Sequence, residues 1–215
     1  MPRSRVPLVL RQAGILLAGL IAAAAVLLWL LPWAAPLPVA VLAFTLWFFR
    51  DPERTAVAGP GDVVAPADGT VLSVTEGDEP RHIHGPAVCV RIYLSLFDVH
   101  VNRAPVTGKV AYRDYVRGGF APASRPGVGE RNERAYTGLV AGPHRVLVVQ
   151  IAGRVARRIV TWVGVGDRLE RGERFGLIRF GSCTQLYLAA GSAIAVRPGD
   201  RVRGASTVIG RLPSP

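Results

Sequence analysis

The stretch VCVRIYLSL (residues 88–96) places an aliphatic side chain at every second position, with Cys, Arg, Tyr and Ser between them. Successive side chains of an extended chain point to opposite faces, so this alternation predicts a half-buried β-strand. Glycine and proline separate further segments of similar character. Helical periodicity is weak throughout residues 51–215, and we expect a mainly β (α+β) domain, a compact barrel or swivel-like unit. Its other predicted strands are 62–65, 70–75, 106–116, 145–151, 155–163, 174–180 and 183–189.

A short internal repeat agrees with a β-rich domain. The segments VGVGDRL (residues 163–169) and VRPGDRV (residues 196–202) share the pattern V-x-x-G-D-R-apolar, about 33 residues apart. Gly and Asp are common in turns, so each copy predicts a hairpin turn. By contrast, residues 118–142 are rich in Gly, Pro, Arg and Ala and are expected to form a long loop, either functional or simply solvated.

The N-terminal region carries no charged residue between Gln12 and Phe49. A charge at the bilayer centre costs about 2.5–3.5 kcal/mol on insertion scales, so a charge-free stretch is readily buried in lipid. Prolines at positions 32, 36 and 38 divide the stretch into two predicted helices, 13–31 and 37–49. Residues 1–50 are therefore expected to form a hydrophobic membrane anchor.

Arginines flank this anchor on both sides, which favours a helical hairpin with both ends in the cytoplasm. A re-entrant hairpin that does not span the bilayer stays open as an alternative. A cleaved signal peptide is disfavoured, because the apolar region is too long and no small-residue cleavage site follows it before Arg50.

The charge points to a polyanionic partner. The formal net charge is +11, and Lys109 is the single lysine. No aromatic-basic interleaving or nucleic-acid motif is present, so an anionic membrane surface is expected and nucleic acid is not. Two cysteines, Cys89 and Cys183, give no disulfide framework, which fits a domain on the cytoplasmic side of the cell (inner) membrane.

Three short motifs carry the candidate chemistry: PADG (residues 66–69), FDVHVNRAPV (residues 97–106) and RFGSCT (residues 179–184). Taken singly, each has an ordinary explanation. An Asp-Gly pair is common in turns, a lone histidine is more often structural than catalytic, and a Gly-Ser pair can be a simple turn.

Together with ERNER (130–134), ARRIV (156–160) and a closing GDRV (199–202), these motifs occur in an order that resembles the phosphatidylserine decarboxylase proenzymes of short bacterial and archaeal type. The resemblance implies a membrane enzyme that converts phosphatidylserine to phosphatidylethanolamine. It also implies self-cleavage between Gly181 and Ser182. The products would be a β chain of residues 1–181 and an α chain of residues 182–215, held as a heterodimer and open to higher homo-oligomers.

The residue types suit that chemistry. Attack by the Ser182 hydroxyl on the Gly181 carbonyl gives an ester, and loss of the α-proton expels the carboxylate and leaves dehydroalanine. Tautomerisation and hydrolysis then release ammonia and leave a pyruvoyl group at position 182. By resemblance, His100 is the base and Asp68 orients it.

The pyruvoyl ketone would form a Schiff base with the substrate amine and accept the electrons of the departing carboxylate. No metal, pyridoxal phosphate or nucleotide is then required. The lipid phosphate is expected to meet a basic segment, because guanidinium groups pair well with phosphate oxygens. The candidate substrate-binding residues are Arg131, Asn132, Arg134, Arg157 and Arg158.

Some features depart from the family pattern. Arg103 stands where some relatives carry a second histidine, so the proton donor to the product is open. Cys183 is expected to be a small apolar strand residue rather than a nucleophile. His82 and His84 have a metal-compatible spacing, but no third ligand is apparent.

The alternative is a non-enzymatic, membrane-tethered module of lipoyl- or biotinyl-carrier type. Such carriers need an acceptor lysine at a tight turn. Lys109 is the one candidate, and its setting TGKV (residues 107–110) lacks the expected flanking pattern.

Overall fold

The computed structural model describes residues 8–55, 59–122, 127–154, 158–178 and 182–213. The chain divides into two compact units, Met1–Pro52 and Glu53–Pro215. We call the second the catalytic unit, after the activity that the sequence resemblance leads us to expect.

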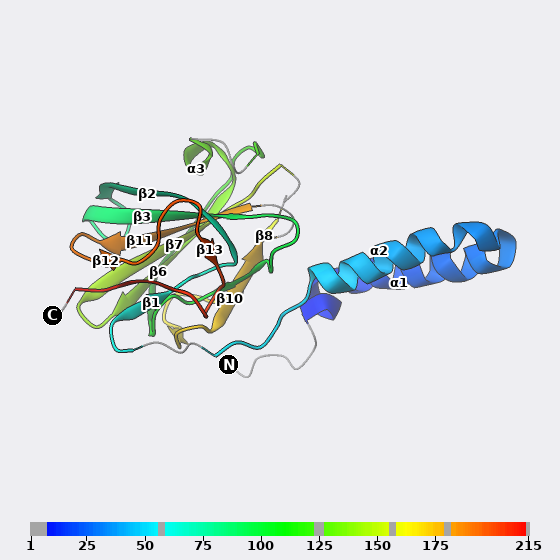
Figure 1. Ribbon diagram of the computed structural model, residues 1–215, viewed down its shortest axis with the longest axis horizontal. Coiled ribbons are helices and arrows are strands. Elements are labelled where there is room, and N and C mark those ends of the chain that lie inside the picture. Colours follow the sequence, from blue (N-terminus) through cyan, green and yellow to red (C-terminus); the bar gives the residue numbers. More distant parts are fainter. Residues whose placement is uncertain (1–7, 56–58, 123–126, 155–157, 179–181, 214–215) are drawn as a thin grey trace. The chain divides into compact units, whose positions relative to one another are not determined.

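The N-terminal unit contains helices α1 (Leu8–Leu30) and α2 (Pro36–Phe48), joined by the 3₁₀ turn η1 (Pro32–Ala34). Proline ends α1 and begins α2, because it lacks the N–H that a helix interior needs but fits the first helical turn. The two helices lie side by side (Figure 1). By length and composition, α1 can cross a membrane over Ala13–Leu30, whereas α2 is shorter. The membrane anchor itself stays a prediction.

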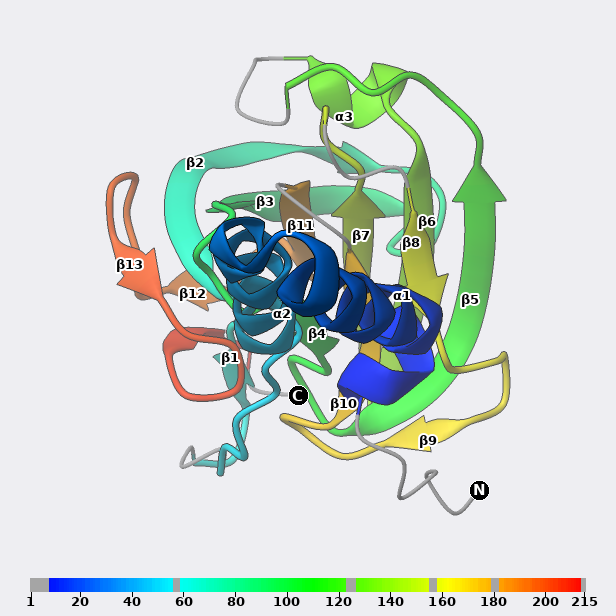
Figure 2. The same cartoon turned by 90° about the vertical axis from the view of Figure 1, so that its right-hand side faces the viewer.

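The catalytic unit is mainly β, as the alternation predicts. Its largest sheet is antiparallel and has eight strands in the order β13-β2-β3-β11-β7-β6-β5-β9. The sheet curls into a half-barrel, so that β2 and β3 run across the upper part of Figure 2 while β5 lies along its right side. Its strands are β2 (Gly69–Glu79), β3 (Gly85–Leu94), β5 (Gly108–Val116), β6 (Arg134–Ala141), β7 (His144–Ile151), β9 (Arg168–Leu169), β11 (Ser182–Ala189) and β13 (Arg201–Val202).

Two three-stranded sheets and a short helix complete the unit. One sheet has the order β1-β14-β12 and the other the order β4-β10-β8. Their strands are β1 (Asp62–Val64), β4 (Val101–Arg103), β8 (Ile159–Thr161), β10 (Arg174–Ile178), β12 (Ala193–Ile194) and β14 (Val208–Arg211), and the helix is α3 (Val128–Arg131).

The main hydrophobic core lies on one face of the curled sheet. Strand β3 contributes Val90 and Ile92, and the neighbouring β11 contributes Leu186 and Leu188, all of them buried. Cys183 belongs to a second cluster with Tyr136, Leu147, Val149 and Ile151. The period of two along β11 therefore sends alternate side chains into different clusters.

One prediction is wrong. The segment 118–142 was expected to be a loop, but it contains α3 and the eight-residue strand β6. The middle of β6 is buried without alternation, so its pattern does not indicate a strand with one exposed face. Gly138 is required there, because a Cβ atom would come within 2.6 Å of the His82 ring.

The predicted hairpins of the two V-x-x-G-D-R copies are not confirmed. Strand β9 pairs with β5, and β13 pairs with β2, and both partners are distant in the sequence. Each copy is a tight turn closed by its own aspartate. Asp167 accepts a hydrogen bond from the Gly164 N–H, and Asp200 accepts one from the Arg197 N–H, both at 2.9 Å.

The two turns dock on the sheet in the same way. Val110 N–H donates to the Asp167 carbonyl at 2.8 Å, and Val71 N–H donates to the Asp200 carbonyl at 2.9 Å. Each copy thus covers the first residues of a long strand, β5 or β2. The repeat in the sequence corresponds to a repeated set of backbone contacts at the two ends of the large sheet.

Candidate active site

Ser182 is the first residue of β11, which lies between β3 and β7 in the large sheet. It pairs with Leu94 of β3 and is completely buried. Its hydroxyl oxygen has no hydrogen-bond partner among the described residues. Leaving a buried polar group unsatisfied costs about 1–3 kcal/mol, so such a hydroxyl calls for a functional explanation. Gly181 lies outside the described residues.

His100 lies beside the strand that leads to Ser182. It precedes β4 and is 3% exposed, and its carbonyl accepts a hydrogen bond from the Ile178 N–H at 3.2 Å. Ile178 ends β10, four residues before Ser182. The pairing of β10 with β4 therefore places the candidate base beside Ile178, close in the chain to Ser182.

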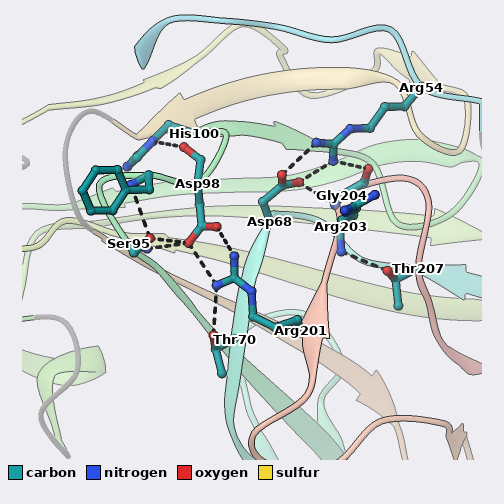
Figure 3. Close-up of polar contacts among 11 residues, drawn as sticks. Arg54, Asp68, Thr70, Ser95, Asp98, His100, Arg201, Arg203, Gly204 and Thr207 are labelled. Atoms are coloured by element: carbon teal, nitrogen blue, oxygen red, sulfur yellow. Dashed lines mark hydrogen bonds and ion pairs between the residues drawn. The ribbon is translucent and has the colours of Figure 1, made fainter. Parts of the chain in front are cut away.

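The His100 ring is oriented by a backbone carbonyl. Nδ1 lies 2.8 Å from the carbonyl oxygen of Asp98 (Figure 3). A carbonyl can only accept, so Nδ1 carries the hydrogen and donates it. In the neutral ring the lone pair then lies on Nε2, which is the atom able to accept a proton.

The Asp98 side chain fixes the loop that positions this carbonyl. It is buried and accepts hydrogen bonds from the Ser95 N–H at 2.8 Å, the Ser95 hydroxyl at 2.7 Å and Arg201 Nη2 at 2.6 Å. Burial alone would raise the pKa of the Asp98 carboxyl. The hydrogen bonds from Ser95 and Arg201 outweigh burial and hold this pKa below its ordinary value.

Asp68 lies in the turn before β2 and has a different set of partners. Arg54 donates hydrogen bonds to both oxygens of the Asp68 carboxylate, and its Nη2 atom lies 2.7 Å from Oδ2. The Gly204 N–H donates to Oδ1 at 2.8 Å. The described hydrogen bonds thus connect Asp68 to Arg54 and Gly204, and the His100 Nδ1 atom to Asp98 (Figure 3).

A chain of polar groups lies buried beside Ser182. Asn102 donates to the Thr184 hydroxyl at 3.1 Å and accepts from Gln150 Nε2 at 2.8 Å. Gln150 in turn accepts from the Thr161 hydroxyl at 3.1 Å. Asn102, Gln150 and Thr184 are all completely buried. These bonds tie β4, β7, β8 and β11 together close to the candidate nucleophile.

Two of the predicted phosphate-binding residues already have hydrogen-bond partners. Asn132 is buried and bonds with Ala121 and with the Ala152 carbonyl. Arg134 donates to the Tyr136 hydroxyl at 2.6 Å and to the Glu130 carbonyl at 2.7 Å.

The remaining phosphate candidates differ in what the structure describes. Arg131 and Arg158 are exposed, whereas Arg157 lies outside the described residues. Strand register places Arg134 at the Ser182 end of the sheet, since Ile151 pairs with both Cys183 and Arg134.

Cys183 and the two histidines with metal-compatible spacing have structural settings. Burial raises the pKa of the Cys183 thiol to about 11, so it stays protonated at neutral pH. His82 Nε2 lies 3.1 Å from the Leu139 carbonyl, and His84 Nδ1 lies 2.8 Å from the Pro80 carbonyl. Within the described ranges, no three His, Cys, Asp or Glu side chains are grouped so as to hold a metal ion.

Three contributors were not identified from the sequence. In the sequence, Arg54 is only one of the arginines that flank the anchor, and Asp98 belongs to a motif but has no assigned role. Gln150 lies in a predicted strand without any further indication. A polar residue in an otherwise apolar strand, VLVVQI (residues 146–151), was the one available indication of Gln150.

Comparison with known proteins identifies the family. Residues 41–210 match the family model for phosphatidylserine decarboxylase. A phosphatidylserine decarboxylase proenzyme from Symbiobacterium thermophilum is 58% identical over 211 residues, covering 97% of this chain and 98% of that protein. The proenzyme from Carboxydothermus hydrogenoformans is 47% identical, covering 84% of this chain and 85% of that protein. The motif resemblance is confirmed, and the chain belongs to the phosphatidylserine decarboxylase family.

Proposed function

We propose that this chain is a proenzyme that cuts itself between Gly181 and Ser182 and then decarboxylates phosphatidylserine to phosphatidylethanolamine. The observation that carries the proposal is the buried Ser182 hydroxyl, which has no partner among the described residues although it begins a central strand. The names of the relatives support the decarboxylation.

Self-cleavage requires a nucleophile and a base. Ser182 Oγ attacks the preceding carbonyl, and His100 Nε2 accepts the hydroxyl proton. The Asp98 carbonyl keeps the proton on Nδ1, so that the basic lone pair of the neutral ring lies on Nε2. Asp68 forms an ion pair with Arg54 and lies in the same region of the unit.

The prosthetic group implied by the family is a pyruvoyl group made from Ser182 itself, and the surroundings fit it. Strand pairing with Leu94 fixes the backbone of position 182, and the Ser182 hydroxyl has no hydrogen-bond partner among the described residues. When formed, the group supplies an electron sink for loss of carbon dioxide from an amino acid. His100 remains beside it to move protons. No metal or pyridoxal phosphate is required.

The substrate implies a membrane setting. Helix α1 is long and apolar enough to anchor the chain, and arginines supply charge for anionic lipid. We place the catalytic unit on the cytoplasmic side of the inner membrane, with the lipid phosphate near Arg131 and Arg158. Residues 1–181 and 182–215 stay together as a heterodimer, and association of several such heterodimers is compatible with the proposal.

The carrier-module alternative has no structural support. Lys109 lies inside β5, where it pairs with Val140 on one side and Arg168 on the other. An acceptor lysine would need a protruding tight turn instead.

The test is intact-mass analysis of the purified full chain, combined with an assay of carbon dioxide release from phosphatidylserine. We expect two chains that separate after residue 181, the smaller with a blocked N-terminus lighter than serine predicts. Ser182→Ala should remain one uncut, inactive chain. Ser192→Ala is the matched control, since Ser192 lies in the same small fragment and bonds to the Ala189 carbonyl. Cleavage in Ser182→Ala, or activity in a preparation that is uncut throughout, would contradict the proposal.

A further inference from the structure

The loop between β3 and β4 exposes two adjacent large apolar side chains. Leu96 is 38% exposed and Phe97 is 70% exposed. Among the described residues of the catalytic unit, the other exposed large hydrophobic side chains are Tyr115 and Val165, which are isolated in the sequence. Isolated exposed apolar residues are ordinary on a protein surface, whereas a neighbouring pair at a loop tip calls for an explanation.

The loop holds this tip in one conformation. The buried Asp98 carboxylate accepts from the N–H and the hydroxyl of Ser95, and the Asp98 N–H donates to the Ser95 carbonyl at 3.2 Å. The Phe97 N–H donates to the Ser95 hydroxyl at 3.3 Å. Because these bonds close the turn from both sides, the two apolar side chains are displayed by a preformed structure, and little ordering entropy is lost on binding.

Both ends of the loop belong to the candidate active site. Leu94, directly before the loop, is the strand partner of Ser182. His100 follows it, with its ring bonded to the Asp98 carbonyl. The apolar tip is therefore close to His100 in the chain, and the strand residue just before the loop pairs with Ser182.

Positive charge accompanies the apolar tip. Arg201 reaches Asp98 from β13 with a side chain that is still 65% exposed, and the whole chain carries a net charge of +11. An apolar tip beside an exposed arginine, on a chain with a positive net charge, suits the interface of an anionic bilayer, where the apolar part is buried at the acyl boundary and the charge meets the headgroups.

We propose that Leu96 and Phe97 insert into the acyl–headgroup boundary of an anionic phospholipid bilayer and so bring the serine headgroup of a membrane lipid to Ser182 and His100. The identity of that lipid rests on the proposed function. The insertion rests on the exposed pair, its fixed loop and the neighbouring charge. The loop would act only on substrate that is embedded in a membrane.

The kinetic test uses the full-length, self-cleaved protein with two forms of substrate. One is long-chain phosphatidylserine in vesicles, and the other is a short-chain phosphatidylserine that is monomeric in water. We expect Phe97→Ser to lower turnover of the vesicle substrate about tenfold, because burial of a phenylalanine side chain is lost. Turnover of the monomeric substrate and the extent of self-cleavage should match the parent protein. Val165→Ser is the matched control, since Val165 is 66% exposed on a different turn.

A second measurement needs no catalysis. Tryptophan is placed at position 97 or, as a control, at position 165, and quenching by brominated lipids in anionic vesicles is compared with the parent protein. We expect additional quenching for Phe97→Trp and none for Val165→Trp.

Equal loss on both substrates, undiminished turnover of the vesicle substrate, or no added quenching at position 97 would overturn the insertion. If the parent protein releases no carbon dioxide from either substrate, the proposed function fails, while the quenching result still decides whether the loop enters the bilayer.

Discussion

Asp68 and Thr107 make the same hydrogen bond at two corresponding places in the fold. Asp68 Oδ1 accepts from the Gly204 N–H at 2.8 Å, and Thr107 Oγ1 accepts from the Arg171 N–H at 3.0 Å. Each residue directly precedes the first residue of a long strand, β2 or β5. The backbone contact is therefore a shared structural device, and the ion pair with Arg54 is an addition on the Asp68 side.

The equivalence predicts that Asp68→Thr keeps the fold but impairs self-cleavage. Threonine can accept the Gly204 hydrogen bond as Thr107 does for Arg171, whereas the negative charge and the Arg54 pair are lost. We expect processing to slow by at least about tenfold, a typical effect of losing one positioned acid–base or charge contribution. The measurement is the time course of cleavage on denaturing gels, with thermal unfolding in detergent as the check on folding.

The matched control for this prediction is Thr107→Ala. It should destabilise the protein by about 1 kcal/mol through the lost hydrogen bond and leave cleavage at the parent rate. Parent-like processing of Asp68→Thr would show that Asp68 acts only as a structural acceptor.

Gln150 is expected to stabilise the region around Ser182 through its two side-chain bonds. Gln150→Met has a similar volume but leaves the Asn102 oxygen and the Thr161 hydroxyl without this partner. We expect a loss of about 1–3 kcal/mol in the free energy of unfolding, as for other unsatisfied buried polar groups. Denaturant unfolding of the uncut Ser182→Ala protein measures this loss without the complication of two chains. An unchanged midpoint would mean that water or a rearranged Asn102 replaces the amide.

Cys183 is expected to be chemically silent although it follows the candidate nucleophile. Its thiol is completely buried, and its pKa is raised to about 11. Cys183→Ala should therefore cleave at the parent rate, at a cost of about 1 kcal/mol for the small cavity. Iodoacetamide should also leave processing of the folded chain unaffected. Abolished cleavage in Cys183→Ala, with its fold intact, would assign the thiol a chemical role.

His82 predicts a dependence of stability on pH. Burial lowers the pKa of its imidazole, and the bond to the Leu139 carbonyl opposes this only in part. The unfolded chain therefore binds the proton more readily than the folded chain, so stability is complete above the unfolded pKa of about 6.5 and falls as the pH drops below it. Denaturant midpoints measured between pH 7.5 and 5.5 should show this decline.

The variant that tests the assignment is His82→Gln. Glutamine does not titrate but can still donate to the Leu139 carbonyl, so the decline below about pH 6.5 should become shallower. If stability falls with pH as steeply in the variant as in the parent protein, another histidine must cause the effect.

The strands that could be predicted from the sequence are those with one face in the core and a turn that separates them from the next strand. β11 agrees with its predicted range to within one residue, because Leu186 and Leu188 alternate with more polar neighbours. β3 overlaps the predicted 88–96 but begins at Gly85 and ends at Leu94, so that Leu96 lies exposed in the loop that follows. β6 was missed because its burial is continuous and its flanks are charged. The packing of Gly138 against the His82 ring connects positions 56 residues apart, and no local pattern reveals such a contact.

For the candidate site, motif order singled out Ser182, His100 and Asp68, and the roles of these residues stay predictions. The partners that hold them in place were not predicted. The bond between Arg54 and the Gly204 carbonyl spans 150 positions, and the pair of Arg201 with Asp98 spans 103. Such partners meet only when the chain is folded, so they could not be predicted from the spacing of residues in the sequence.

The central place of β11 has a consequence for the life of the mature protein. Eight residues of this strand pair with β3 and six with β7, and β12, β13 and β14 pair elsewhere in the unit. A chain severed before Ser182 would thus keep its tail through non-covalent pairing alone. Once melted, the two pieces would have to find each other by diffusion, so heating would inactivate the processed form permanently while the uncut precursor could refold. The resistance of the processed form to heat would therefore be set by its unfolding rate rather than by its free energy of unfolding.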